Sequence, residues 1–329
     1  MFKMKYNMIL LILLFINPLM SMSMNSYLSI WMNMELNLIL FLTFIIMNNF
    51  NMYDLSMKYF LINSMSSSIF LFMIIMNYLN LMDIYNFLIN LMMFIKLGMP
   101  PFHFWYIDLM MNLNWLSCLM ISTWQKLIPM LIIYYIFNMK FILIILIYSM
   151  FICIFKGFMS FNLKIIFGYS SINHLCWMLI LLIYSINLWM IYYFCYLILS
   201  LSVFLMMNKF NLIYLNDMNK INFFFQKKIN LMILFSMGGL PPFFGFLIKW
   251  LSILKMVFLN NYFLLMMMIF FSLIFLYYYI RLVFNYMFLF NNLLKYNFMF
   301  LFLKKSMKMN LFFYVLSILN LFMVLFYLN

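Results

Sequence analysis

The sequence predicts an all-α, polytopic membrane protein. Of the 329 residues, 70% are hydrophobic and only 7% are charged, whereas soluble globular chains average about 45–50% apolar and about 25% charged residues. Apolar runs of about 18 residues or more recur along the whole chain, and each is long enough to cross about 30 Å of hydrocarbon as a helix. Intrinsic disorder is excluded because it requires low hydrophobicity.

Polar breaks divide the chain into about eleven predicted transmembrane helices. They lie near 6–22, 28–47, 58–76, 84–111, 113–136, 141–156, 165–184, 188–207, 229–257, 262–284 and 310–328. The loops are short except 208–228 and 286–309, so we expect a single transmembrane domain over residues 1–329. The first span follows Lys3 and Lys5 as in a signal peptide, but no clear cleavage site comes after it. We therefore expect it to be retained as a helix.

Two spans, 84–111 and 229–257, are longer than one crossing requires, and both contain the motif G-x-P-P-F. Residues 98–102 read Gly-Met-Pro-Pro-Phe and residues 239–243 read Gly-Leu-Pro-Pro-Phe. Proline removes a backbone donor and clashes with the preceding turn, so each motif is predicted to break its helix. Matched broken helices in two halves of a chain are typical of inverted-repeat transporters. We therefore expect an inverted-repeat, antiporter-like fold.

The composition indicates an organellar gene. The chain has no Ala and a single Arg, Arg281, but 41 Met and 44 Phe. Ala helps membrane helices to pack closely, so its absence has no physical cause, whereas AT-rich codons with ATA read as Met explain it. We infer an invertebrate mitochondrial gene and a protein of the mitochondrial inner membrane.

The basic residues predict the orientation. If the spans alternate, the side of the N-terminus carries thirteen lysines and the opposite side carries only Lys140 and Lys255. The thirteen are Lys3, Lys5, Lys58, Lys156, Lys164, Lys209, Lys220, Lys227, Lys228, Lys295, Lys304, Lys305 and Lys308. The positive-inside rule then places the N-terminus in the matrix and the C-terminus in the intermembrane space. The net charge of +14 reflects this topology and contact with phospholipids, and no nucleic-acid partner is expected because the charges are dispersed over membrane loops.

Four charged residues lie inside the spans: Glu35, Lys96, Lys126 and Lys249. A charge at the bilayer centre costs about 2.5–3.5 kcal/mol, and such residues face a wet interior or a partner. The alternative is a long side chain that reaches the interface near a helix end. Lys96 and Lys249 flank the two breaks and leave this alternative open, whereas Lys126 lies near the middle of its span.

These residue types permit a proton relay. Burial disfavours the charged forms of both Lys and Glu, and a nearby opposite charge favours them, so moving a Glu relative to a Lys switches whether the Lys holds its proton. His174 is predicted as a relay between lysines or, alternatively, as a hydrogen-bonded core histidine. His103 either caps backbone freed by the first break or joins the relay. The candidate catalytic residues are Glu35, Lys96, Lys126, Lys249 and His174.

No cofactor-binding or metal-binding residue is predicted on this chain. The four cysteines lack CxxC spacing and lie in apolar segments, whereas iron–sulfur ligation needs clustered thiolates. Two histidines are too few for a two-haem cytochrome, and no Gly-rich nucleotide loop is present. Lys58 is expected to anchor the interface, and solvated acids are expected at Asp54, Asp83, Asp108 and Asp217.

Four stretches together resemble the subunit 2 family of mitochondrial NADH:ubiquinone oxidoreductase (respiratory complex I), which is related to cation/proton antiporters. They are KLGMPPFHFW at 96–105, TWQKLIP at 123–129, YSSINH at 169–174 and GGLPPFFGFLIKW at 238–250. Their order and spacing hold over nearly the whole chain, and together they are highly specific. One departure is Ile107-Asp108 in place of the family's common Pro-Glu, which leaves a role for Asp108 without support.

The resemblance implies a core membrane-arm subunit that translocates protons while other chains carry electrons from NADH to ubiquinone. Animal members have lost three of the family's fourteen helices, which leaves eleven. By resemblance, Glu35 matches the intramembrane Glu, Lys96 its ion-pair partner, Lys126 the central Lys and Lys249 the Lys that faces the neighbouring subunit. NADH, FMN, iron–sulfur clusters and ubiquinone are then expected on partner subunits. The expected partners are the antiporter-like subunit 4, the small core membrane subunits and accessory subunits.

Two other functions remain as alternatives. The first alternative is a free-standing cation/proton antiporter, which would be found outside any NADH-oxidising assembly. A structural membrane scaffold is the second alternative, but four intramembrane charges argue against it because a scaffold does not require them.

Overall fold

A computed structural model of the protein describes residues 2–48, 53–78, 85–136, 139–215, 217, 224–241 and 243–294, of which 2–7, 139–140, 224–229 and 285–294 are described as backbone only. This part of the chain is helical apart from turns and one isolated bridge between Asn162 and Tyr214. The predicted span 310–328 and the lysines at 220, 295, 304, 305 and 308 lie outside the described residues, as does Asp83.

The helices follow the predicted spans closely. They are α1 (Phe2–Met22), α2 (Tyr27–Asn48), α3 (Tyr53–Tyr78), α4 (Tyr85–Leu97), α5 (Phe104–Asn112), α6 (Trp115–Ser122), η1 (Trp124–Lys126), α7 (Leu127–Tyr135), α8 (Met139–Met159), α9 (Leu163–Tyr184), α10 (Ile186–Phe210), α11 (Phe224–Gly238), α12 (Phe244–Phe258) and α13 (Tyr262–Leu294). Seven stretches, counting α6 to α7 as one, are long and apolar enough to cross a membrane, and two shorter apolar helices accompany them. The prediction of an all-α polytopic membrane protein is confirmed.

Both G-x-P-P-F motifs interrupt their spans, between α4 and α5 and between α11 and α12. The two helices end in the same way, at a glycine with positive φ: +67° at Gly98 and +79° at Gly239. In each case the next residue donates a backbone hydrogen bond five residues back, from Met99 to Phe94 and from Leu240 to Phe235. This is a glycine C-terminal cap, which proline commonly follows. The glycine therefore ends the helix, and the prolines prevent it from continuing.

The span 113–136 also contains a break. Residues 124–126 form a single 3₁₀ turn between α6 and α7. Pro129 lies in the first turn of α7 and has no N–H to donate to the carbonyl of Gln125, four residues earlier. The missing bond loosens the helix on the N-terminal side of Pro129, which is where the 3₁₀ turn containing Lys126 lies.

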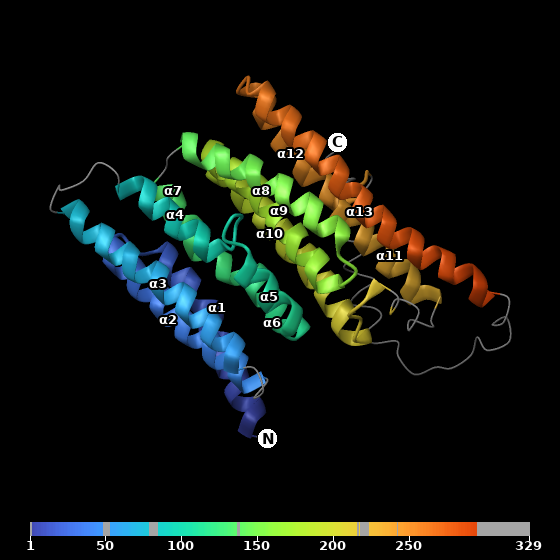
Figure 1. Cartoon of the computed structure of the whole chain (residues 1–329), viewed down its shortest axis with the longest axis horizontal. Coiled ribbons are helices and arrows are strands. Elements are labelled where there is room, and N and C mark those ends of the chain that lie inside the picture. The colour runs from blue at the N-terminus through green and yellow to red at the C-terminus, as the bar shows by residue number, and fades with distance from the viewer. Residues whose placement is uncertain are drawn as a thin grey trace. The chain divides into compact units, whose positions relative to one another are not determined.

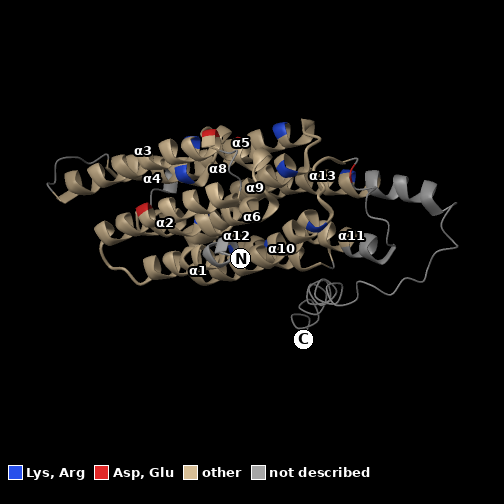
Figure 2. Ribbon diagram, turned by 90° about the horizontal axis from the view of Figure 1, so that it is seen from below, with Lys and Arg blue, Asp and Glu red and all other residues tan. Residues whose placement is uncertain are grey.

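The chain divides into two compact units, residues 1–149 and 150–329. In the first unit α2 packs between α1 and α3, and α3 packs on α4. Figure 1 shows α4 beside α3, and Figure 2 shows α2 between α1 and α3. The turn η1 contacts α1 and α4. In the second unit α10 packs against α9, α11 and α12, and α13 packs against α11 and α12.

Charged residues are sparse along the described helices, and Figure 2 marks their positions. In the second unit several helix ends that carry basic residues lie together. Leu163 at the start of α9 donates its N–H to the carbonyl of Ile213, just after α10. The guanidinium of Arg281 on α13 donates to the carbonyl of Phe158 at the end of α8, at 2.8 Å. These bonds put the ends of α8 and α10, the start of α9 and this part of α13 at one end of the unit.

Two details differ from the predictions. Lys164, which the sequence places just before the predicted span 165–184, is only 7% exposed. The side chain of Asn162 accepts a bond from the N–H of Lys164 and so caps α9, which places Lys164 in the first turn of a buried helix. The loop predicted over 286–309 begins later, because α13 continues to Leu294; no Gly or Pro stops it.

Candidate functional site

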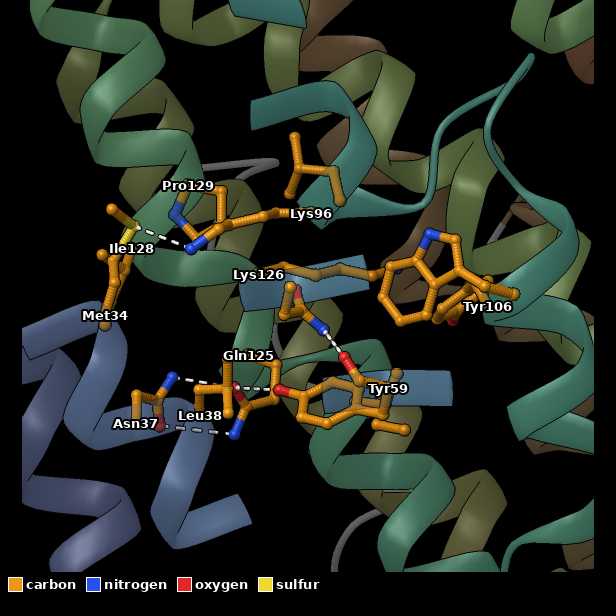
Figure 3. A pocket seen from close by; sticks show the side chains of 14 residues that line it. Met34, Asn37, Leu38, Tyr59, Lys96, Tyr106, Gln125, Lys126, Ile128 and Pro129 are labelled. Atoms are coloured by element: carbon orange, nitrogen blue, oxygen red, sulfur yellow. Dashed lines mark hydrogen bonds between the residues drawn. The ribbon is translucent and has the colours of Figure 1, made fainter. Parts of the chain in front are cut away.

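The first unit contains a small polar cavity beside the first helix break and the 3₁₀ turn (Figure 3). Its volume is about 30 Å³, measured as the space open to the centre of a water molecule. A water needs about 10–15 Å³ on this measure, so the cavity has room for about two. It is lined by Met34, Asn37, Leu38, Tyr59, Asn63, Lys96, Leu97, Trp105, Tyr106, Ile121, Gln125, Lys126, Ile128 and Pro129. The fold therefore brings Lys96 and Lys126 to one cavity.

Lys96 lies in the last turn of α4, just before the glycine that ends the helix. A cation is favoured there by the partial negative charge of the helix C-terminus. Its ammonium donates to the thioether sulfur of Met34, with Nζ and Sδ 3.6 Å apart. Thioether sulfur is a weak acceptor, and an ammonium has three donors. The cavity is thus where water can supply stronger acceptors to Lys96.

Lys126 is 3% exposed and ends the 3₁₀ turn. Its Nζ lies 4.8 Å from the centre of the Tyr106 ring, a cation–π contact. The Tyr106 side chain can occupy this position because Gly98 has no side chain. A Cβ on Gly98 would lie 2.6 Å from the Cβ of Tyr106. The first helix break therefore also places the aromatic ring that covers Lys126.

A hydrogen-bonded set of polar side chains that the sequence analysis missed lines the same cavity. The amides of Asn37 on α2 and Gln125 in the 3₁₀ turn bond reciprocally, at 2.7 Å from Nδ2 to Oε1 and 3.3 Å from Nε2 to Oδ1. The hydroxyl of Tyr59 on α3 also donates to Gln125 Oε1, at 3.4 Å. Figure 3 shows these three side chains next to the lysines. The sequence does contain a sign of this set, because both amides lie inside apolar spans. Asn37 comes two residues after Glu35, and Gln125 comes directly before Lys126.

Glu35 is on the same helix, α2, but is not among the residues that line the cavity. Met34, Asn37 and Leu38 form the buried face of this helix, whereas Glu35 is half-buried beside it. Its carboxylate acts electrostatically on Lys96, yet within the described residues the two groups form no ion pair. The expected ion pair is therefore replaced by a longer-range interaction, because Met34 occupies the position that faces Lys96.

Lys249 lies in the second unit, on α12, and is 6% exposed. Its Nζ donates to the carbonyl of Gly238 at 3.0 Å, one of the carbonyls left at the end of α11 by the second break. Gly239 makes room for it, since a Cβ at Gly239 would lie 2.9 Å from Nζ. Lys249 thus binds the broken end of α11 rather than reaching for an interface.

His174 is buried in the middle of α9, 1% exposed. Its Nδ1 and the hydroxyl of Tyr192 are 2.9 Å apart and share a hydrogen bond, and the ring of Tyr196 lies 5.1 Å from the imidazole. The two tyrosines on α10 are partners that the sequence analysis did not name. His103 Nδ1 lies 3.2 Å from the carbonyl of Pro101, as expected for a side chain that caps backbone freed by the first break.

Among the described residues, the other charged residues singled out from the sequence do not line this cavity. Lys58 forms an ion pair with Asp108, 3.7 Å apart, and both side chains are about half exposed. Asp217 accepts bonds from the N–H groups of Ile213 and Tyr214, so it caps a turn rather than being only solvated. Asp54 is exposed in the first turn of α3.

The four cysteines are buried thiols, and the described part of the chain contains no group of three His, Cys, Asp or Glu residues that could hold a metal.

Comparisons with known proteins identify the family of this chain. Residues 24–276 match the family described as NADH:quinone oxidoreductase/Mrp antiporter, TM. The chain is 38% identical to NADH-ubiquinone oxidoreductase chain 2 of Anopheles gambiae over 330 residues, 97% of this chain and 96% of that protein. It is 35% identical to the chain of the same name from Aedes aegypti over 299 residues, 87% of each.

The fold is also similar to a solved structure. A chain of respiratory complex I from Thermus thermophilus matches with a TM-score of 0.75 and 17% identity, over 90% of this chain and 72% of that one. The identity and coverage of the insect relatives decide the family, and the solved structure decides the fold. The chain belongs to the NADH-ubiquinone oxidoreductase chain 2 family, the antiporter-like membrane subunits of respiratory complex I.

Proposed function

We propose that this chain translocates protons as a core subunit of the membrane arm of complex I, through Lys96 and Lys126. The observation that carries the proposal is the shared cavity of about 30 Å³ that both lysines line. Two ionisable groups beside a space for about two waters can exchange a proton without crossing hydrocarbon. The weak thioether partner of Lys96 leaves its proton available for transfer.

One cavity water carries the proton from Lys96 to Lys126 in the proposed transfer. An N–H bond of the Lys96 ammonium breaks as a cavity water takes the proton, and another O–H bond of that water breaks as its proton binds the neutral amine of Lys126. The products are a neutral Lys96, an unchanged water and a Lys126 ammonium over the Tyr106 ring. Glu35 controls the starting state, because its negative charge favours the charged form of Lys96.

In the second unit, His174 and Lys249 are proposed to continue the relay. The buried His174–Tyr192 pair offers a group that can both accept and donate a proton. Lys249 donates a hydrogen bond to the end of α11 at the second break, and Lys96 lies in the last turn of α4 at the first break. The matched glycine caps at Gly98 and Gly239 support an inverted repeat. Eleven crossings in one transmembrane domain over residues 1–329 are part of the same proposal.

The proposed setting is the mitochondrial inner membrane, with the N-terminus in the matrix and the C-terminus in the intermembrane space. Subunit 4, the small core membrane subunits, accessory subunits and phospholipids are the proposed partners. NADH, FMN, iron–sulfur clusters and ubiquinone are assigned to other chains. Protease digestion of oppositely oriented inner-membrane vesicles tests the orientation: loop 208–228 and the segment after Leu294 should both be cut only from the matrix side.

The alternative, a free-standing cation/proton antiporter, is separated from this proposal by two experiments on intact membranes. Blue-native electrophoresis should find the chain only in an NADH-oxidising assembly. A density map of the intact membrane arm should show ordered water between Lys96 and Lys126. A dry cavity between the two lysines contradicts the proposed transfer, whichever assembly holds the chain.

A further inference from the structure

Helix α1 contains an internal proline that exposes one particular carbonyl. In an α-helix each N–H bonds to the carbonyl four residues earlier, and Pro18 lies inside α1 without an N–H. The carbonyl of Leu14 therefore has no helical donor. The side chains of both Leu14 and Pro18 are buried, and a buried carbonyl without a donor is costly.

The donor comes from Trp124, 110 residues along the chain. Its indole Nε1 donates to the carbonyl of Leu14 at 2.7 Å. The indole ring also meets the Phe15 ring edge to face, with centroids 4.7 Å apart. The indole N–H is the only donor of this side chain. It therefore supplies the hydrogen bond that the Leu14 carbonyl lacks because of Pro18.

Trp124 begins the three-residue turn that ends at Lys126. The next residue, Gln125, is tied to Asn37 on α2 by its two amide bonds. The turn is thus held against α1 by one residue and against α2 by the next, and Lys126 follows directly.

We propose that the Trp124–Leu14 hydrogen bond sets the position of Lys126, and that α1 contributes to proton transfer through Pro18. Trp124 is a positioning residue, since it acts through the turn and does not itself carry the proton. This inference rests on the proposed role of Lys126.

The geometry of the turn explains why an anchor is needed. A 3₁₀ turn advances about 120° and about 2.0 Å per residue, against about 100° and about 1.5 Å for an α-helix. If the three residues relaxed to α-helix, Lys126 would rotate by about 60° and shift by about 1.5 Å relative to α6. That change is enough to take its ammonium off the Tyr106 ring and out of line with the cavity.

Two substitutions act on this hydrogen bond from opposite sides, one by removing its donor and the other by adding a competing donor. Trp124→Phe keeps an aromatic ring against Phe15 but loses the N–H. Pro18→Ala gives α1 an N–H that competes for the Leu14 carbonyl, while it improves the helix. In assembled complex I reconstituted into liposomes, we expect each variant to lower NADH-driven proton pumping several-fold. The double variant should be no worse than Trp124→Phe alone, because both changes act through the same bond and Trp124→Phe already removes it.

A matched control is Trp31→Phe. The indole of Trp31 on α2 also donates to a backbone carbonyl, that of Ser67 on α3, at 3.0 Å, but it is not part of the turn. We expect Trp31→Phe to lower the stability of the complex by a similar amount and to leave the number of protons pumped per NADH unchanged. This number is a suitable readout because a loss of stability alone does not change it.

Lys126→Met separates failure of this inference from failure of the proposed function. If Lys126→Met pumps normally, the relay itself is wrong. If Lys126→Met is impaired, then Trp124→Phe should have no further effect in that background. Normal pumping by Trp124→Phe, or additive losses with Pro18→Ala, would overturn the positioning role. Should Trp124→Phe fail to assemble, Pro18→Ala alone decides the question.

Discussion

Lys96 donates a hydrogen bond to the sulfur of Met34 at 3.6 Å, although Glu35 directly follows Met34 in the chain. Successive residues on a helix point about 100° apart, so when Met34 faces the cavity, Glu35 does not. The carboxylate therefore influences Lys96 through space instead of holding its proton in an ion pair. A group with this arrangement can change its protonation state when α2 shifts slightly.

Glu35→Gln removes that influence and tests it directly. We expect a larger population of neutral Lys96, because an opposite charge no longer favours the ammonium, and reduced pumping in a complex that still assembles. Proton uptake by NADH-driven vesicles measures the effect. Asp54→Asn, at an exposed position of the same unit, is the control and should pump normally. A fully pumping Glu35→Gln complex would make Glu35 a structural residue.

Lys126 is tested by substitutions that separate charge from proton exchange. Lys126→Met keeps the length and packing but holds no proton, and Lys126→Arg keeps the charge and the contact with Tyr106 but does not release its proton. A relay requires both variants to be impaired in proton-coupled NADH oxidation. If Arg restores pumping and Met does not, Lys126 supplies only fixed positive charge.

The reciprocal amides of Asn37 and Gln125 predict a non-additive pair. Asn37→Leu or Gln125→Leu alone leaves a partly buried amide without its partner, which costs about 1–3 kcal/mol. The double substitution should cost less than the sum of the two, because it removes both polar groups. Thermal stability of the purified complex measures all three variants. Strictly additive losses would show that the two amides do not depend on each other.

The glycine caps predict sensitivity to a single methyl group. Gly98→Ala forces a left-handed backbone onto alanine, at about 1–3 kcal/mol, and pushes against Tyr106; Gly239→Ala does the same against Lys249. We expect both to lower the thermal stability of the assembled complex. Gly157→Ala is the control for crowding alone: a Cβ there would lie 3.0 Å from the Tyr278 hydroxyl, but Gly157 lies inside α8 and has no left-handed backbone. Equal behaviour of all three variants would contradict the cap.

The sequence by itself determined the membrane class, the approximate positions of the spans that the structure describes, and both helix breaks at the G-x-P-P-F motifs. These follow from local properties: apolar run length fixes a helix that crosses lipid, and Gly followed by Pro ends a helix whatever surrounds it. It also picked out Lys96, Lys126 and His174, because a charged or titratable group inside an apolar run is visible without any contact information.

Only the tertiary structure decided which of these groups meet. Whether Met34 or Glu35 faces Lys96 depends on how α2 is rotated in the unit, and periodicity leaves that open in a helix that is apolar nearly all round. The bond from Trp124 to Leu14 joins residues 110 positions apart, and nothing in either segment specifies the other. Burial then fixes both outcomes, because in hydrocarbon each polar group must find its partner within the protein.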